Sequence, residues 1–111
     1  MGEKGTGSPF LEVIVVPTYI MLSTLTESGA ETLREHPDRL KEVNREIEAM
    51  GVKVVQQYAV LGPYDFVNIV EAPDNDTVAR VSVELGARGS VRIVTLAGIP
   101  IDVFVGRLKK K

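Results

Sequence analysis

The short run Gly62-Pro63-Tyr64-Asp65 places a phenol hydroxyl next to a carboxylate. At the mouth of a cleft, Tyr64 and Asp65 could orient a polar ligand through their oxygen atoms. Neighbouring strand residues point to opposite faces, so both side chains enter one cleft only where the turn redirects one of them. The same residues also suit a hairpin turn, because glycine reaches unusual backbone angles and aspartate bonds nearby amides. The turn is the favoured interpretation.

Polar residues in the middle of apolar segments form a second candidate set: Ser23, Gln56, Tyr58, Asn68 and Thr95. A buried Asn68 without a partner costs about 1–3 kcal/mol, so we expect it to meet another side chain, water or a ligand. Two interpretations stay open, a ligand pocket and a polar network that fixes the register of a dimer. The network is favoured, because buried polar groups usually satisfy one another.

Strand alternation predicts which of these side chains share a face. Asn68 lies on the face of Phe66 and Val70, whereas Val67 and Ile69 point the other way and suit a helix-covered core. We therefore predict Phe66 and Val70 in an oligomer interface on the open face of a sheet. The predicted ligand-binding residues are Gln56, Tyr58, Tyr64, Asp65, Asn68 and Thr95.

Other chemistry-bearing residues favour structural roles. His36 precedes a proline at a helix break, with no acid or nucleophile placed beside it by the local sequence. Arg88 and Arg92 could hold an anion, but the glycine-bearing segment 86–90 lacks the P-loop pattern. We predict no catalytic residue.

Composition narrows the classes of site further. The chain has no cysteine and one histidine, which excludes disulfides, thiolate nucleophiles and multi-histidine metal sites. An acidic cluster is formed by Glu71, Asp74 and Asp76. It lacks the spacing of an EF-hand calcium site, and helix capping explains it more simply. We predict no metal and no cofactor. A formal net charge of -2 disfavours nucleic-acid binding, since it gives no broad positive field.

The elements that must position these residues follow from periodicity and from helix stop signals. The first half holds a strand over 18–25 and a helix that starts at 26, breaks at 36–37, restarts and ends at Gly51. Two strands follow, over 52–61 and 64–72, and then a helix that starts after the loop 73–77. The last elements are a strand over 91–96 and a short helix over 101–108. This order predicts an α+β, ferredoxin-like βαββαβ fold, with a four-stranded antiparallel sheet and two helices on one face. The other face then needs cover, and burial of about 800 Å² per partner in a dimer provides it.

The ends of the chain lie outside this pattern. Residues 1–16 are either an extra edge strand over Phe10 to Val16 or upstream sequence read through before a native start at Val16. They show no secretory signal and no run of about 20 apolar residues, so we expect a cytoplasmic protein without a membrane partner. Residues 17–108 form the predicted single domain, and 109–111 form a basic tail.

The segment Leu61-Gly62-Pro63-Tyr64-Asp65-Phe66-Val67 resembles the GYD-domain family. The resemblance continues in Pro17 to Leu22, Val70 to Asn75, Leu85 to Gly89 and Ile99 to Asp102, so it covers nearly all of the chain except the leader and the lysine tail. It implies a small α+β domain similar to the dimeric α+β barrel proteins, and it implies no particular reaction.

The leading hypothesis is a non-enzymatic, self-associating α+β module, a dimer or higher homo-oligomer, that binds a small molecule in the cleft on its open sheet face. One alternative is a cofactor-independent dimeric-barrel enzyme of the monooxygenase or isomerase type, using Tyr58, Asn68 and Tyr64. A second alternative is an effector-sensing subunit, which would need a separate partner because the chain carries no helix-turn-helix. Fold-level analogy does not choose among them.

Overall fold

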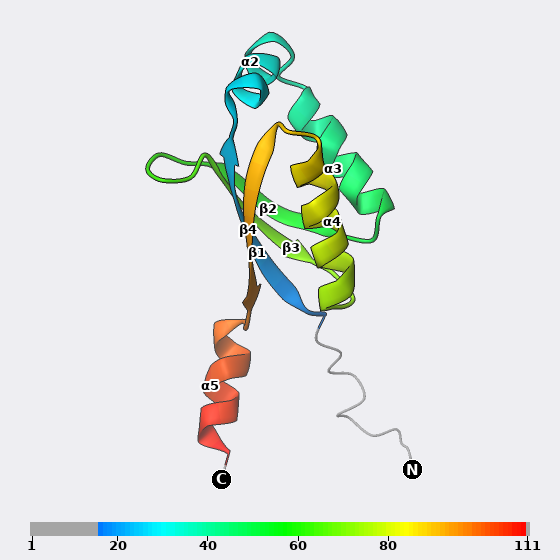
Figure 1. Cartoon of the computed structure of the whole chain (residues 1–111). Coiled ribbons are helices and arrows are strands. Elements are labelled where there is room, and N and C mark those ends of the chain that lie inside the picture. Colours follow the sequence, from blue (N-terminus) through cyan, green and yellow to red (C-terminus); the bar gives the residue numbers. More distant parts are fainter. Residues whose placement is uncertain (1–15, 111) are drawn as a thin grey trace.

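A computed structural model describes residues 16–110 (Figure 1). Its centre is an antiparallel sheet of four strands in the order β2-β3-β1-β4. The strands are β1 (Thr18–Leu25), β2 (Lys53–Ala59), β3 (Phe66–Glu71) and β4 (Val91–Gly98). The predicted α+β, ferredoxin-like arrangement is confirmed, and β2 and β3 form the predicted antiparallel hairpin.

Helices α3 and α4 lie side by side against one face of this sheet, while α2 lies at one end of it (Figure 1). The helices of the described chain are α2 (Glu27–Glu35), α3 (Arg39–Ala49), α4 (Asn75–Ala87) and α5 (Ile101–Lys109). The break predicted at His36-Pro37 separates α2 from α3. None of these helices is long and apolar enough to cross a membrane.

Local signals explain where the helices begin and end. The Thr26 hydroxyl accepts a hydrogen bond from the Gly29 amide, and Asp74 accepts one from the amide of Thr77, so each caps the start of its helix. Gly51, just after the end of α3, has φ +99°, a backbone conformation that residues with a side chain rarely adopt. Periodicity and caps together therefore define these elements.

Gly29 has a second role that the sequence alone did not indicate. A Cβ atom at this position would lie 2.0 Å from the carbonyl oxygen of Ser90, on the segment that leads into β4. The Thr26 amide donates to that same oxygen at 3.0 Å. The absence of a side chain lets the first turn of α2 approach the sheet this closely.

The core lies between the sheet and the helices. Its residues show that the predicted assignment of the two faces of β3 was wrong. Phe66 and Val70 are buried there, Val70 completely, so they are not available for an interface on the open face. Val67 and Ile69 point to that open face instead, opposite to the prediction. The buried cluster is Tyr19, Met21, Ile47, Val52, Val70, Ala72, Val78, Val81 and Leu85.

The face of the sheet away from the helices is apolar as well. Register places Val67 opposite Leu22 and Ile69 opposite Ile20, and paired residues share a face. Val94 and Leu96 on β4 extend this surface, and both remain exposed. An antiparallel sheet with one solvated face normally alternates apolar and polar residues, and this one does not.

The predictions for residues 1–15 lie outside the described residues. Val16 and Pro17, which are described, have no regular secondary structure. At the other end, α5 runs through Lys109, so the first residue of the predicted basic tail belongs to the helix.

Candidate functional site

The Gly-Pro-Tyr-Asp segment forms the connection between β2 and β3. Gly62 has φ +110°, which explains the glycine there. Asp65 fastens this connection to β1: its Oδ2 accepts a hydrogen bond from the Leu25 amide at 2.8 Å, and its own amide donates to the Ser23 carbonyl at 2.9 Å. Its carbonyl also accepts from the amide of Val60 at 2.8 Å. These contacts agree with the structural interpretation of the motif.

The structure does not bring the predicted ligand-binding residues together. Gln56 and Tyr58 point to the open face, because Gln56 pairs with Ile69 and Tyr58 with Val67. Asn68 faces the helices. The cause is an irregularity in register between Val54 and Gln56, which reverses the facing of the rest of β2.

The remaining members of that set are separated too. Thr95 lies on the helix-covered side, where its Oγ1 lies 2.7 Å from Oγ of Ser82 on α4. Tyr64 and Asp65 belong to the β2–β3 connection, where both are half-buried. The predicted single cleft on the open face is therefore not assembled from these six residues.

A pocket of about 130 Å³ lies on the opposite side, between the sheet and helices α2 and α3. Its apolar walls come from Met21 and Phe66 on the sheet and from Leu40, Val43 and Ile47 on α3. Asn68 also lines it, and its Oδ1 is buried without a hydrogen-bond partner among the described residues. Of the predicted ligand-binding residues, Asn68 is the one that lines this pocket.

Two amides on the wall of the pocket satisfy each other. Asn44 Nδ2 donates to Gln57 Oε1 at 2.8 Å, and Gln57 Nε2 donates to Asn44 Oδ1 at 3.2 Å. The sequence analysis missed both residues. A signal was available for Asn44, because it occupies the i+4 position of the apolar stripe that begins at Leu40 and continues to Ile47.

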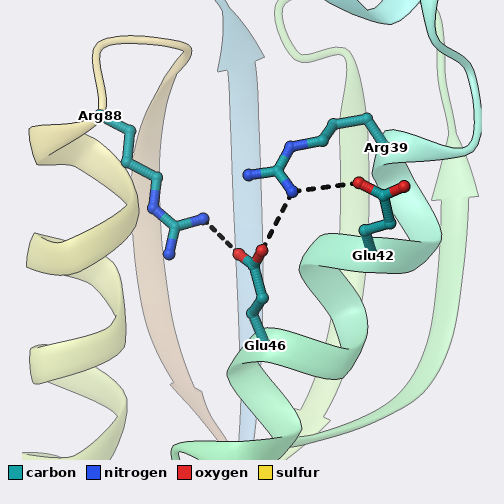
Figure 2. A network of polar contacts seen from close by, with 4 residues as sticks. All are labelled: Arg39, Glu42, Glu46 and Arg88. Carbon is teal, nitrogen blue, oxygen red and sulfur yellow. Dashed lines mark hydrogen bonds and ion pairs between the residues drawn. The ribbon is translucent and has the colours of Figure 1, made fainter.

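A network of charged side chains ties α3 to the end of α4 (Figure 2). Arg39 Nη1 donates to Glu42 at 3.2 Å and to Glu46 at 3.0 Å, and Arg88 donates to the other oxygen of Glu46. The hydrogen bond from Arg88, followed by that from Arg39, lowers the pKa of Glu46 from its ordinary value. Glu46 therefore links two cations across two helices.

The structure does not support the anion site considered as an alternative at Arg88 and Arg92. Arg88 is engaged by Glu46. Arg92 pairs with Thr24 of β1 and points to the open face of the sheet. Of the acidic residues near α4, Asp74 caps the helix, since the Thr77 hydroxyl and amide both donate to its carboxylate and lower its pKa. Among residues 16–110, no three acidic or histidine side chains are grouped as a metal site.

Helix α5 presents a second exposed apolar surface. It continues from β4 and extends away from the sheet, with little contact to the other elements (Figure 1). Its exposed apolar residues follow the spacing i, i+3, i+4 and i+7, which places them on one side of a helix. They are Ile101, Phe104, Val105 and Leu108, here called the α5 stripe.

Comparisons with known proteins agree with the fold. The family model of the GYD domain matches residues 19–106. A relative from Thermus thermophilus, named glutamine synthetase and cystathionine beta-lyase binding protein, is 60% identical over 95 residues, which are 85% of this chain and all of that protein. The crystal structure of TTHA0845, also from Thermus thermophilus, is similar with a TM-score of 0.50 at 22% identity, over 76% of this chain and 94% of that one. The chain belongs to the GYD domain family.

Proposed function

We propose that this chain is a binding protein for metabolic enzymes, and that glutamine synthetase and cystathionine beta-lyase are its partners. The observation that carries this proposal is the 60% identity to the Thermus thermophilus protein along that protein's whole length. Identity at this level along the whole length of a small domain supports a shared binding role. A cytoplasmic location belongs to the same proposal.

Helix α5 is the element that we assign to enzyme docking. An amphipathic helix that enters a groove uses apolar anchors at i, i+3, i+4 and i+7, and the α5 stripe has this spacing. Ile101 and Leu108 are 69% and 68% exposed, so the two ends of the stripe have no cover within the chain. Phe104 is the aromatic residue of the stripe and the expected energetic centre of the contact.

Positive charge at the end of α5 favours a partner groove with an acidic rim. Arg107 and Lys109 lie in the last turn, and Lys110 follows directly. Exposed cations beside an apolar stripe favour a partner groove with an acidic rim, because complementary charges speed association and orient the helix. Binding to such a groove weakens as the salt concentration rises.

The open sheet face is assigned to a different contact, with a second copy of this chain. This face carries an apolar surface that a two-fold dimer would bury against the same surface of the second copy, formed by Leu22, Val67, Ile69 and Leu96. A dimer of this kind buries about 800 Å² per partner. In this proposal α5, at the end of β4, lies outside the dimer contact, so that one dimer would present two docking helices.

The α5 assignment is tested with purified glutamine synthetase immobilised on a biolayer interferometry sensor. We expect the double variant Phe104→Asp, Leu108→Asp to weaken binding about tenfold or more, since it places two charges in the apolar contact. Val83→Asp is a control for one added charge at an exposed apolar position, because Val83 is a 71% exposed valine on another helix, α4. The control should bind as the unchanged chain does.

The outcomes separate the two parts of the proposal. If the unchanged chain does not bind the enzyme, the proposed function is wrong. If it binds and the double variant binds equally well, α5 is not the docking element. Both variants should retain the oligomeric state of the unchanged protein, which size-exclusion chromatography measures.

A further inference from the structure

The pocket between the sheet and α3 contains one polar atom whose bonding the chain leaves incomplete. Oδ1 of Asn68 is shielded from solvent and has no hydrogen-bond partner among the described residues. An orphan acceptor of this kind is unfavourable by about 1–3 kcal/mol unless another molecule supplies a donor. We propose that the pocket binds a small neutral molecule, an apolar ring that carries one hydrogen-bond donor, with the donor directed to Asn68.

The size of the pocket limits the ligand to about one ring. Its volume is about 130 Å³. An engineered apolar cavity of about 150 Å³ in another protein stays dry and takes up benzene. A phenol-sized molecule therefore fits within this space.

The lining favours an apolar body for this ligand. Met21 and Phe66 form the sheet side, and Leu40, Val43 and Ile47 form the α3 side. The Phe66 ring and the Met21 thioether both make favourable contacts with an aromatic ring. Burial of a ring between these side chains provides the main driving force for binding.

Three polar side chains that line this pocket, Asn44, Gln57 and Arg39, are already engaged with other residues, which disfavours a charged ligand. Asn44 and Gln57 use their amides on each other. Arg39 lines the pocket, but its guanidinium bonds to both Glu42 and Glu46, so its charge is balanced. A ligand carboxylate would have to compete with two protein carboxylates for this one cation.

Water is the competing occupant, and the geometry disfavours it. A buried water normally needs two to four polar partners, roughly three on average. In the sheet Asn68 lies between Met21 and Gln57, and the Gln57 amide is already bonded to Asn44, so it is not free to hold a water. A single donor on an apolar ring satisfies Oδ1 without leaving other hydrogen-bonding groups unpaired.

The test is a titration of the ¹⁵N-labelled full chain followed by NMR, with phenol and toluene as probes of nearly equal shape. We expect both probes to shift the amide signals of Leu40 and Ile47, with phenol binding roughly three- to tenfold more tightly because it alone donates to Asn68. This comparison needs no variant. The inference goes beyond the proposed enzyme binding and is tested without any partner protein.

A pair of amide-to-leucine variants assigns the preference to Asn68. Asn68→Leu should bind toluene and lose the preference for phenol, whereas Gln56→Leu, on the open face, should keep it. Thermal melting by circular dichroism confirms that each variant is folded. The proposal is overturned if neither probe shifts the pocket signals, if phenol binds no better than toluene to the unchanged chain, or if a folded Asn68→Leu keeps the preference.

Discussion

At the residue scale, the hydrogen bonds of Asp65 all go to backbone groups of other residues. Its carboxylate bonds the Leu25 amide, and its amide and carbonyl bond Ser23 and Val60. These bonds join the β2–β3 connection to the end of β1, 40 residues away in sequence. The aspartate of the motif therefore has a sufficient structural explanation.

Replacement of Asp65 by alanine should lower the free energy of unfolding by about 1–3 kcal/mol, because the Leu25 amide loses a charged acceptor. Urea unfolding measures this change. Glu48→Ala, on the exposed side of α3, is the control and should stay within about 0.5 kcal/mol of the unchanged chain. Equal stability of the two variants would contradict the role given to Asp65.

Glu46 gives a prediction about pH. Arg88 and Arg39 hold its pKa below the ordinary value of 4.5, so the folded state prefers the ionised carboxylate. The resulting stabilisation is present above that value and is lost as the pH falls through the lowered pKa. Exposure to solvent and salt keeps the effect modest.

The stability difference between the unchanged chain and Glu46→Gln should therefore shrink as the pH falls from about 6 to about 3. Urea midpoints at several pH values measure it. A difference that stays constant across this range would show that the network in Figure 2 contributes no pH-dependent stability.

At the element scale, the close approach of α2 to the sheet depends on Gly29. Gly29→Ala should destabilise the fold by about 1–3 kcal/mol, because its Cβ would overlap the Ser90 carbonyl. Gly86→Ala is the matched control, since Gly86 lies in α4 with open space around it and alanine is the better helix former. The control should gain about 0.5–1 kcal/mol. Thermal or urea unfolding in which both variants change in the same direction would contradict this account.

The sequence predicted the existence and order of the elements, because local chemistry determines them. Thr26 and Asp74 cap helices, His36-Pro37 breaks one, and Gly51 ends one. The faces of the strands could not be predicted in the same way. Both faces of β3 are largely apolar, so alternation is compatible with two assignments, and the prediction of Phe66 and Val70 on the open face was wrong.

The composition of the site was harder to predict than the fold. A single irregularity near Val55 turns Gln56 and Tyr58 away from Asn68, and nothing in the local sequence indicates it. Asn44 and Gln57 meet only because α3 packs on β2. Contacts between segments distant in sequence determine which polar residues share a pocket, and short motifs do not predict such contacts.

At the scale of the whole molecule, the open sheet face and the α5 stripe are apolar surfaces on different elements. Val67→Asp should weaken self-association about tenfold or more, because it buries a charge in the proposed dimer contact. Val83→Asp is again the control, with an equal charge change on the outer side of α4. Sedimentation velocity measures the subunit number, and a monomeric unchanged chain, or a Val67→Asp variant that still associates, would contradict the sheet-face dimer.

The measurement that tests the central claim most directly is sedimentation velocity of the fluorescently labelled chain mixed with purified glutamine synthetase. We predict that the label moves with the enzyme, that unlabelled chain displaces it, and that the displaced label returns to the position of the free protein. Label that sediments as free protein at every enzyme concentration up to about 10 μM, a range that detects affinities typical of specific complexes, would contradict the account.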